Sequence, residues 1–118
     1  MKEKVYEIDG KNLSIEQIYE IADAKSNEIK VVLTQDAREK ILASRKYVDD
    51  IVKKGQPVYG INTGFGALSD KFIAEDELET LQYNLIRSHC TGVGRPFSRL
   101  VTRAIMLLRA NCLASGFS

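Results

Sequence analysis

The sequence predicts an α+β fold that is predominantly α-helical, with short strands only near the N-terminus. Two short β-branched segments occur in the first third of the chain, at Val5–Ile8 and Ile29–Leu33. The remaining two thirds carry helix caps and apolar residues at helical spacing. Strands followed by a run of helices are typical of an α+β architecture.

The N-terminal third predicts a strand, a short helix and a second strand. Val5–Ile8 alternates in polarity and stops at Asp9-Gly10, a turn dipeptide. Ser14–Gln17 fits a capping box, which predicts a helix from there to about Ala24. Ile29–Leu33 is the second β-branched segment.

A longer helix is predicted after the second strand. Thr34 can cap its N-terminus, and Lys53 and Lys54 suit the negative end of its dipole. Gly55, followed by Pro57, predicts its end. Its apolar positions are Ala37, Ile41, Val48, Ile51 and Val52.

Two further helices are predicted in the C-terminal half. The third begins at Ala74, carries acidic residues in its first turn, and ends at Gly92. The fourth takes Pro96 into its first turn and ends at Gly116. The stripe of the third helix consists of Leu78, Leu81, Leu85, Ile86 and then His89. The fourth is apolar over too wide an arc for a surface helix, so we expect it to be surrounded.

Composition places the chain among soluble globular proteins. Its 118 residues are 44% hydrophobic and 28% charged, a composition that excludes disordered and collagenous proteins. The net charge of +1 favours neither nucleic acid nor an anionic membrane as a partner. The longest apolar run, Ala104–Leu108, is far shorter than the roughly 20 residues of a membrane span. Residues 1–7 lack the apolar core of a signal peptide, so we expect a cytoplasmic location.

The two cysteines do not predict a metal site. Cys90 and Cys112 fall in predicted helical stretches and lack zinc-ligand spacing. We expect reduced, partly buried thiols and no metal.

Glycines concentrate in two loops that could carry function. Five of the eight lie in two windows, Gly60–Gly66 and Gly92–Gly94. The windows fit either ligand-approaching loops or tight connections between helices. Nucleotide-binding motifs fail, because Phe65 follows Gly64 where a Walker loop needs lysine, and Ser69 replaces the last glycine of a dinucleotide fingerprint.

Three ordered blocks resemble a known enzyme family. The blocks are YGINTGFG at Tyr59–Gly66, LQYNLIRSHCTGVG at Leu81–Gly94 and RANCLASG at Arg109–Gly116. They resemble the N-terminal part of the aromatic amino acid ammonia-lyase family, and most closely its histidine ammonia-lyases. The resemblance covers roughly residues 55–118. It implies that residues 1–118 form an N-terminal domain or fragment of a larger fold.

The resemblance implies a catalytic base at Tyr59, in the loop that also contains Gly60, Gly64 and Gly66. Tyr59 matches the family's tyrosine that removes the β-proton of the substrate. A phenol is a weak acid, so nearby positive dipoles would have to favour its phenolate form, and the glycine-rich backbone could supply them. Without the resemblance, a tyrosine beside a glycine is more often a packing residue.

The resemblance also implies substrate-binding residues at Ser88, His89 and Asn62. Ser88-His89 matches the selectivity pair of members that use histidine, and Asn62 resembles the same branch. His89, the chain's single histidine, could hydrogen-bond an imidazole substrate. The alternative is a core histidine at the end of an apolar stripe. Sequence does not reveal the ring's tautomer.

The family's electrophile is a methylidene-imidazolone made by cyclising an internal Ala-Ser-Gly tripeptide. Ala114–Gly116 has these letters, but the family's cyclising tripeptide lies further downstream, in a G-S-x-G-A-S-G-D-L segment. We therefore interpret Ala114–Gly116 as a helix end. We expect no such group in this chain, and we expect the chain alone to be inactive.

Three functions remain open at the level of sequence. The first is a fragment of a cytoplasmic histidine ammonia-lyase, whose parent enzyme converts L-histidine to trans-urocanate and ammonia and, as in the family, assembles as a homotetramer. The second is a non-catalytic helical module or truncated product that self-associates through its last helix. The third is a family member acting on tyrosine or phenylalanine, as a lyase or an aminomutase.

Overall fold

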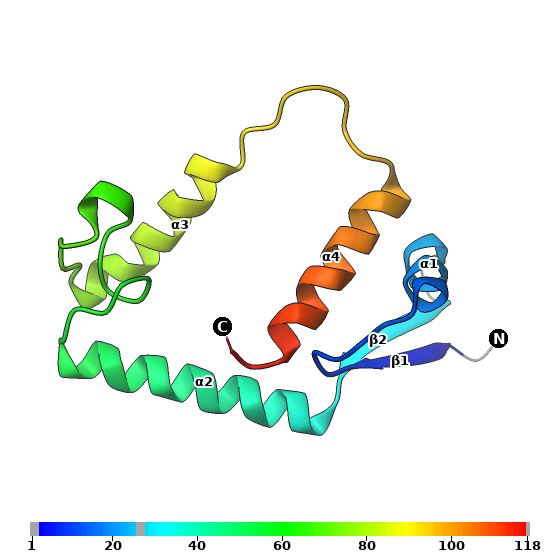
Figure 1. Cartoon of the computed structure of the whole chain (residues 1–118), viewed down its shortest axis with the longest axis horizontal. Helices are drawn as coiled ribbons and strands as arrows, with labels where there is room; N and C mark the ends of the chain where they lie inside the picture. The colour runs from blue at the N-terminus through cyan, green and yellow to red at the C-terminus, as the bar shows by residue number, and fades with distance from the viewer. Residues whose placement is uncertain (1–2, 26–27, 118) are drawn as a thin grey trace. The chain divides into compact units, whose positions relative to one another are not determined.

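The computed structural model describes residues 3–25 and 28–117, whose helices and strands are drawn in Figure 1. These residues form two compact units. Among these residues, the first unit comprises 3–25, 28–45 and 96–117, and the second comprises 46–95. Helix α2 (Gln35–Lys54) contributes its first part to one unit and its last part to the other. The predominantly helical α+β prediction is confirmed.

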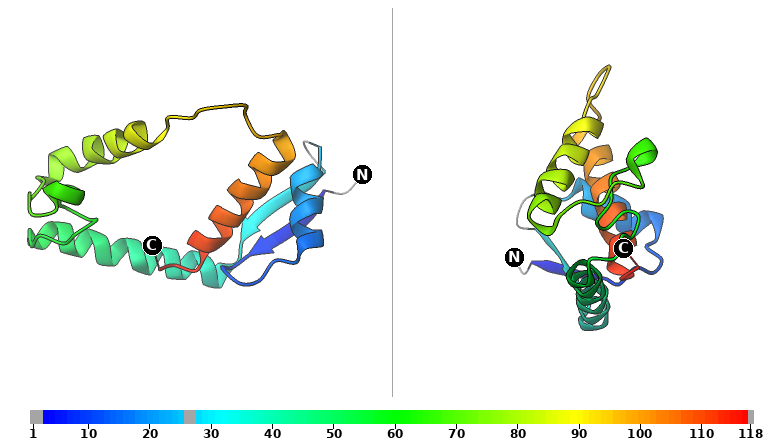
Figure 2. Two further views of the ribbon diagram at one scale, coloured as in Figure 1. Left: turned by 45° about the horizontal axis from the view of Figure 1, so that its top comes forward. Right: turned by 90° about the vertical axis from the view of Figure 1, so that its left-hand side faces the viewer.

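The first unit opens with a parallel β-α-β arrangement. Strand β1 (Lys4–Ile8) pairs in parallel with β2 (Ile29–Leu33), with Lys4 opposite Ile29 and Ile8 opposite Leu33. Helix α1 (Ile15–Asp23) connects them, because parallel neighbours need a crossover (Figure 2). The predicted strands and helix are confirmed, with β1 starting one residue earlier than expected.

The predicted capping box starts α1. The Ser14 hydroxyl accepts a hydrogen bond from the Gln17 amide at 3.2 Å, and the Gln17 side chain accepts one from the Ser14 amide at 2.9 Å. Two amides that have no partner within the helix are thereby satisfied.

The core of the first unit lies between the β-α-β arrangement and helix α4 (Arg99–Ala114). Ile8, Ile21 and Leu107 form its buried cluster, and α1 packs against α4. The partly buried residues around this cluster are Tyr6, Leu13, Ile18 and Ile29. Residues from both ends of the chain therefore share one core.

The predicted start of the fourth helix was wrong. Pro96 lies outside α4, and the N-cap is Ser98, whose hydroxyl accepts a hydrogen bond from the Val101 amide at 3.3 Å. A serine directly before the apolar run satisfies a helix amide, which proline cannot do. Only one face of α4 is buried, so the described residues of the first unit do not surround the helix as its wide apolar arc predicts.

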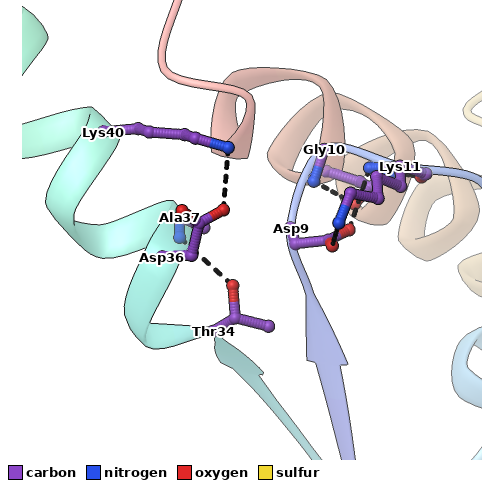
Figure 3. Close-up of polar contacts among 8 residues, drawn as sticks. Asp9, Gly10, Lys11, Thr34, Asp36, Ala37 and Lys40 are labelled. Carbon is purple, nitrogen blue, oxygen red and sulfur yellow. Dashed lines mark hydrogen bonds and ion pairs between the residues drawn. The ribbon is translucent and has the colours of Figure 1, made fainter.

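The turn after β1 packs against the end of α4. The Asn111 amide oxygen accepts from the Gly10 N–H at 3.1 Å, and its nitrogen donates to the Lys11 carbonyl at 2.6 Å. Figure 3 shows the same turn, in which Lys11 pairs with Asp9 at 2.9 Å. This side-chain hydrogen bond from Lys11 holds the pKa of Asp9 below its ordinary value. Asn111 thus joins the turn to α4.

Helix α2 has the predicted cap and the predicted end. The Thr34 hydroxyl accepts from the Ala37 amide at 3.2 Å, as Figure 3 shows beside the Asp36–Lys40 ion pair. Gly55 follows the last helical residue with φ +64°. Lys53 and Lys54 occupy the last turn, as predicted.

In the second unit, the third helix is shorter than predicted. A 3₁₀ turn, η2 (Glu75–Glu77), holds the acidic residues, and α3 (Leu78–His89) follows it. The helix ends at His89, three residues before Gly92, and in its last turn the Ser88 and His89 side chains both contact the Leu85 carbonyl. Ile86, expected on the buried stripe, is 66% exposed.

The cysteine prediction was wrong on burial. Both thiols are free and exposed, and Cys90 lies just past the end of α3. Cys112 lies in α4 but outside its buried face. Within residues 3–25 and 28–117, no helix has the length and hydropathy to cross a membrane.

Candidate functional site

The predicted functional residues all lie in the second unit, in the loop that follows α2 and at the end of α3. Asn62 organises the loop. Its side-chain oxygen accepts from the Val58 amide at 2.7 Å, and its nitrogen donates to the Gln56 carbonyl at 2.9 Å. The side chain is buried, and both of its polar groups bind backbone on either side of Pro57. Asn62 therefore holds the segment from which Tyr59 projects.

The loop then closes on itself. The Gly64 amide donates to the Lys71 carbonyl at 2.9 Å, and the Ile73 amide donates to the Asn62 carbonyl at 2.9 Å. A Cβ on Gly64 would lie 2.6 Å from the Leu68 carbonyl oxygen, so only glycine fits without a backbone shift. Gly64 is thus required by close packing within the loop.

The other two loop glycines shape turns and leave open space. Gly60 and Gly66 have φ of +81° and +58°, and no atom lies within 4 Å of where their Cβ atoms would be. Gly66 begins a short 3₁₀ turn, η1 (Gly66–Leu68).

Tyr59 is exposed and rests against Phe65. Their ring centroids are 6.1 Å apart with an interplanar angle of 74°, an edge-to-face contact. Tyr59 is 64% exposed, so its phenol is accessible.

At the end of α3, Ser88 and His89 share one carbonyl. The Ser88 hydroxyl donates to the Leu85 carbonyl at 2.7 Å, and His89 Nδ1 lies 2.9 Å from the same oxygen. Ser88 Oγ and His89 Nδ1 are themselves 3.0 Å apart. The Leu85 carbonyl thus fixes both members of the predicted selectivity pair.

A hollow of about 340 Å³ brings the loop and the end of α3 together. Its walls are mostly apolar, with Ser88 and His89 among its polar residues. The lining residues are Gly64, Phe65, Leu68, Lys71, Ile73, Leu81, Asn84, Leu85, Ser88 and His89. A ligand entering it would meet both the glycine loop and the predicted selectivity pair.

The structure therefore brings some of the predicted site residues together at the hollow and leaves others outside it. Ser88, His89 and Gly64 line the hollow, and Tyr59 adjoins it through Phe65. Asn62 lies beneath the loop, bonded to backbone.

Sequence reasoning missed two residues of this site. Phe65 both lines the hollow and supports Tyr59, and its position between two glycines was the available signal. The role of the Leu85 carbonyl had no sequence signal, because it depends on side-chain rotamers.

Ala114–Gly116 does not fit the family's cyclising tripeptide. Ala114 is the last residue of α4, and the Ser115 hydroxyl donates to the Cys112 carbonyl at 2.8 Å. The Gly116 nitrogen donates to the Leu113 carbonyl at 3.1 Å, with φ +80°. These are the bonds of a helix C-terminus, so the helix-end prediction is confirmed. Among residues 3–25 and 28–117, no three potential metal-ligating side chains gather.

A protein-family comparison decides the affiliation. The model of the aromatic amino acid lyases matches residues 13–118. The chain belongs to the aromatic amino acid lyase family. Its blocks at Tyr59–Gly66, Leu81–Gly94 and Arg109–Gly116 all lie inside the matched range.

Curated relatives within the family are named histidine ammonia-lyases. The chain is 53% identical over 111 residues to that of Caldanaerobacter subterraneus subsp. tengcongensis, covering 94% of this chain and 21% of the relative. It is 50% identical over 118 residues to that of Treponema denticola, covering 100% and 23%. The chain thus spans about a fifth of the length of these relatives.

The fold also matches solved structures of the family. A crystal structure of ergothionase, an ergothioneine-degrading enzyme of Treponema denticola, superposes with a TM-score of 0.85 at 37% identity. The match covers 96% of this chain and 22% of that enzyme. An enzyme with a different named substrate therefore has a similar fold, so the fold alone does not identify the substrate.

Proposed function

We propose that this chain is the part of a histidine ammonia-lyase that supplies the catalytic base and the residues that recognise the substrate ring. The enzyme that contains it would convert L-histidine to trans-urocanate and ammonia. The observation that carries the proposal is the Ser88-His89 pair in the hollow beside the Tyr59 loop. The identities of 53% and 50% to proteins named histidine ammonia-lyase support the same substrate.

Tyr59 would remove the β-proton. The phenol is accessible, and contact with Phe65 restricts where the ring can lie. As phenolate, Tyr59 Oη would take the proton from the β-carbon, the electrons would form the Cα–Cβ double bond, and the α-amino group would leave. Asn62 would contribute to substrate binding through the loop, since its side chain holds the backbone on either side of Pro57.

His89 would orient the substrate ring. An imidazole bound in the hollow would lie beside apolar walls formed in part by Leu81 and Phe65, which suit a flat heteroaromatic ring. A hydrogen bond from the substrate ring to His89 would distinguish histidine from phenylalanine, because phenylalanine leaves the His89 nitrogen without a partner.

In the family, a methylidene-imidazolone supplies the electrophile that makes the amine a better leaving group. Ala114–Gly116 does not fit that group, so the proposal assigns it to no residue here. Homotetrameric assembly, which the family resemblance implies, and the cytoplasmic location expected from the sequence are part of the same proposal.

The test uses a longer protein that contains this chain and has the length of the curated relatives. We expect Tyr59→Phe to abolish urocanate formation while histidine binding changes little, because only the base is lost. A Tyr83→Phe variant, which removes an exposed tyrosine hydroxyl from α3, is the matched control and should retain activity. Retained turnover in Tyr59→Phe would exclude Tyr59 as the base.

A substrate panel separates histidine from the alternatives. Tyrosine, phenylalanine and ergothioneine are offered beside histidine to the same protein. We expect the highest kcat/KM with histidine. A preference for another amino acid, or a β-amino acid product, would favour a different lyase or an aminomutase.

A further inference from the structure

We infer that Ser88 and the Leu85 carbonyl hold His89 as the Nδ1–H tautomer, which leaves Nε2 as a hydrogen-bond acceptor. The tautomer follows from contacts within this chain. Its use on a substrate rests on the proposed function.

The Leu85 carbonyl decides where the proton lies. His89 Nδ1 is 2.9 Å from this oxygen, which can only accept hydrogen bonds. A neutral imidazole carries one N–H and one lone pair. If Nδ1 carried the lone pair, two acceptors would face each other at hydrogen-bond distance. A proton on Nδ1 turns the same contact into a hydrogen bond.

Ser88 supports the same assignment. Its hydroxyl has one proton, and the 2.7 Å contact directs that proton to the Leu85 carbonyl. Toward Nδ1, at 3.0 Å, Ser88 Oγ therefore presents a lone pair. The alternative tautomer would require Ser88 to turn its proton to Nδ1 and give up its bond to Leu85. Ser88 is thus a positioning residue that acts through the His89 ring.

The tautomer sets a chemical rule for the substrate. Nε2 of a neutral His89 accepts, so the facing atom must carry a proton. An imidazole N–H meets this requirement, as would a phenol hydroxyl, whereas a phenyl ring does not. The Ser88-His89 pair therefore selects for rings with a hydrogen-bond donor and against phenylalanine.

The tautomer can be measured without a substrate. His89 is the single histidine, so ¹⁵N-histidine labelling of the untagged chain gives ring signals from residue 89 alone. Long-range ¹H–¹⁵N spectra at a pH where the ring is neutral distinguish protonated from unprotonated ring nitrogens. We expect Nδ1 to be the protonated nitrogen, the reverse of the preference of free histidine. A majority of Nε2–H would overturn the inference.

Matched serine variants test the positioning role. Ser88→Ala should raise the Nε2–H population, because Nδ1 loses one of its two acceptors. Ser69→Ala removes an exposed hydroxyl elsewhere in the second unit and should leave the tautomer unchanged. An unchanged tautomer in Ser88→Ala would show that Ser88 does not position the His89 ring. The wild-type spectrum stands as a test even if a variant fails to fold.

Failure of this inference and failure of the proposed function give different results. A protein that forms urocanate while His89 is Nε2–H would retain the function and refute the tautomer. A protein in which His89 is Nδ1–H but which leaves histidine unreacted would retain the tautomer and refute the proposed function. In the longer enzyme, N-methylated histidines that lack a ring N–H when neutral should lose at least tenfold in kcat/KM, and undiminished turnover would refute the donor rule.

Discussion

Asn111 binds Gly10 across 101 residues of sequence: its side-chain oxygen accepts the Gly10 N–H at 3.1 Å, while its nitrogen donates to the neighbouring Lys11 carbonyl at 2.6 Å. One buried amide therefore satisfies the turn after β1 and fixes it to α4. The Arg109–Gly116 block, noted by resemblance to the family, has in this structure a role in folding.

Loss of the Asn111 amide should destabilise the first unit. Asn111→Ala leaves the Gly10 N–H and the Lys11 carbonyl without their partner, which costs about 1–3 kcal/mol of the free energy of unfolding. Urea denaturation followed by circular dichroism measures the change. Asn12→Ala, at an exposed position in the same connection, is the control and should stay within about 0.5 kcal/mol. Equal effects of the two substitutions would contradict the assignment.

A side chain at Gly10 should be tolerated poorly. Its φ is +85°, and a Cβ would lie 2.6 Å from the backbone Cα and N of Ser115. Gly10→Ala combines left-handed strain with a backbone clash, so we expect a loss of at least about 2 kcal/mol. Gly92→Ala, where φ is not positive and no atom is within 4 Å, should be neutral or slightly stabilising. A lower melting temperature for Gly92→Ala than for Gly10→Ala in thermal unfolding would refute this packing.

Acid should weaken the first unit partly through Glu20. A side-chain hydrogen bond from Lys4, and a second from Tyr6, hold the pKa of Glu20 below its ordinary value of 4.5. Because the folded pKa is lowered, the stabilisation is present above pH 4.5 and is lost as pH falls through the folded value. Urea midpoints between pH 7 and 3 should fall less steeply in Glu20→Gln than in wild type.

Glu7→Gln is the control for that pH series, because Glu7 is an exposed carboxylate on the same strand as Lys4. It should retain the wild-type slope. Parallel curves for Glu20→Gln and wild type would show that the Lys4–Glu20 pair does not contribute.

The isolated chain should self-associate through α4. Val101, Ile105 and Leu108 share one helix face and are 39%, 50% and 48% exposed. An apolar face of this kind is costly in water, so a second copy is expected to cover it. Size-exclusion chromatography with light scattering should give more than the 13.2 kDa of one chain. Ile105→Lys should restore the monomer and Thr80→Lys on α3 should not; a monomeric wild type would contradict the prediction.

Local chemistry could be predicted from the sequence where a side chain binds the backbone nearby. The capping box at Ser14 and Gln17 and the cap at Thr34 are such cases, and each has the predicted bond. The predicted helix ends at glycines are also confirmed, because Gly55 and Gly116 adopt positive φ after α2 and α4. These features depend on four or five consecutive residues.

Contacts between distant segments could not be predicted in this way. The parallel pairing of β1 with β2 and the Asn111–Gly10 bond depend on which segments the core brings together. The start of α4 was misplaced because proline and serine both favour helix starts, and only Ser98 forms the cap. In the site, the resemblance identified Ser88 and His89, but their common bond to the Leu85 carbonyl required coordinates.

The proposed function has this chain supply the base and the ring-recognising residues of a histidine ammonia-lyase. Urocanate formation from L-histidine, followed by ultraviolet absorbance, tests it in the longer protein and in the purified 118-residue chain. We predict urocanate and an equal amount of ammonia from the longer protein, and none from the chain alone, in which Ala114–Gly116 ends α4 and does not fit the family's cyclising tripeptide. A longer protein that binds histidine without eliminating ammonia would refute the proposed function, and urocanate formed by the 118-residue chain would refute the predicted inactivity of the chain alone.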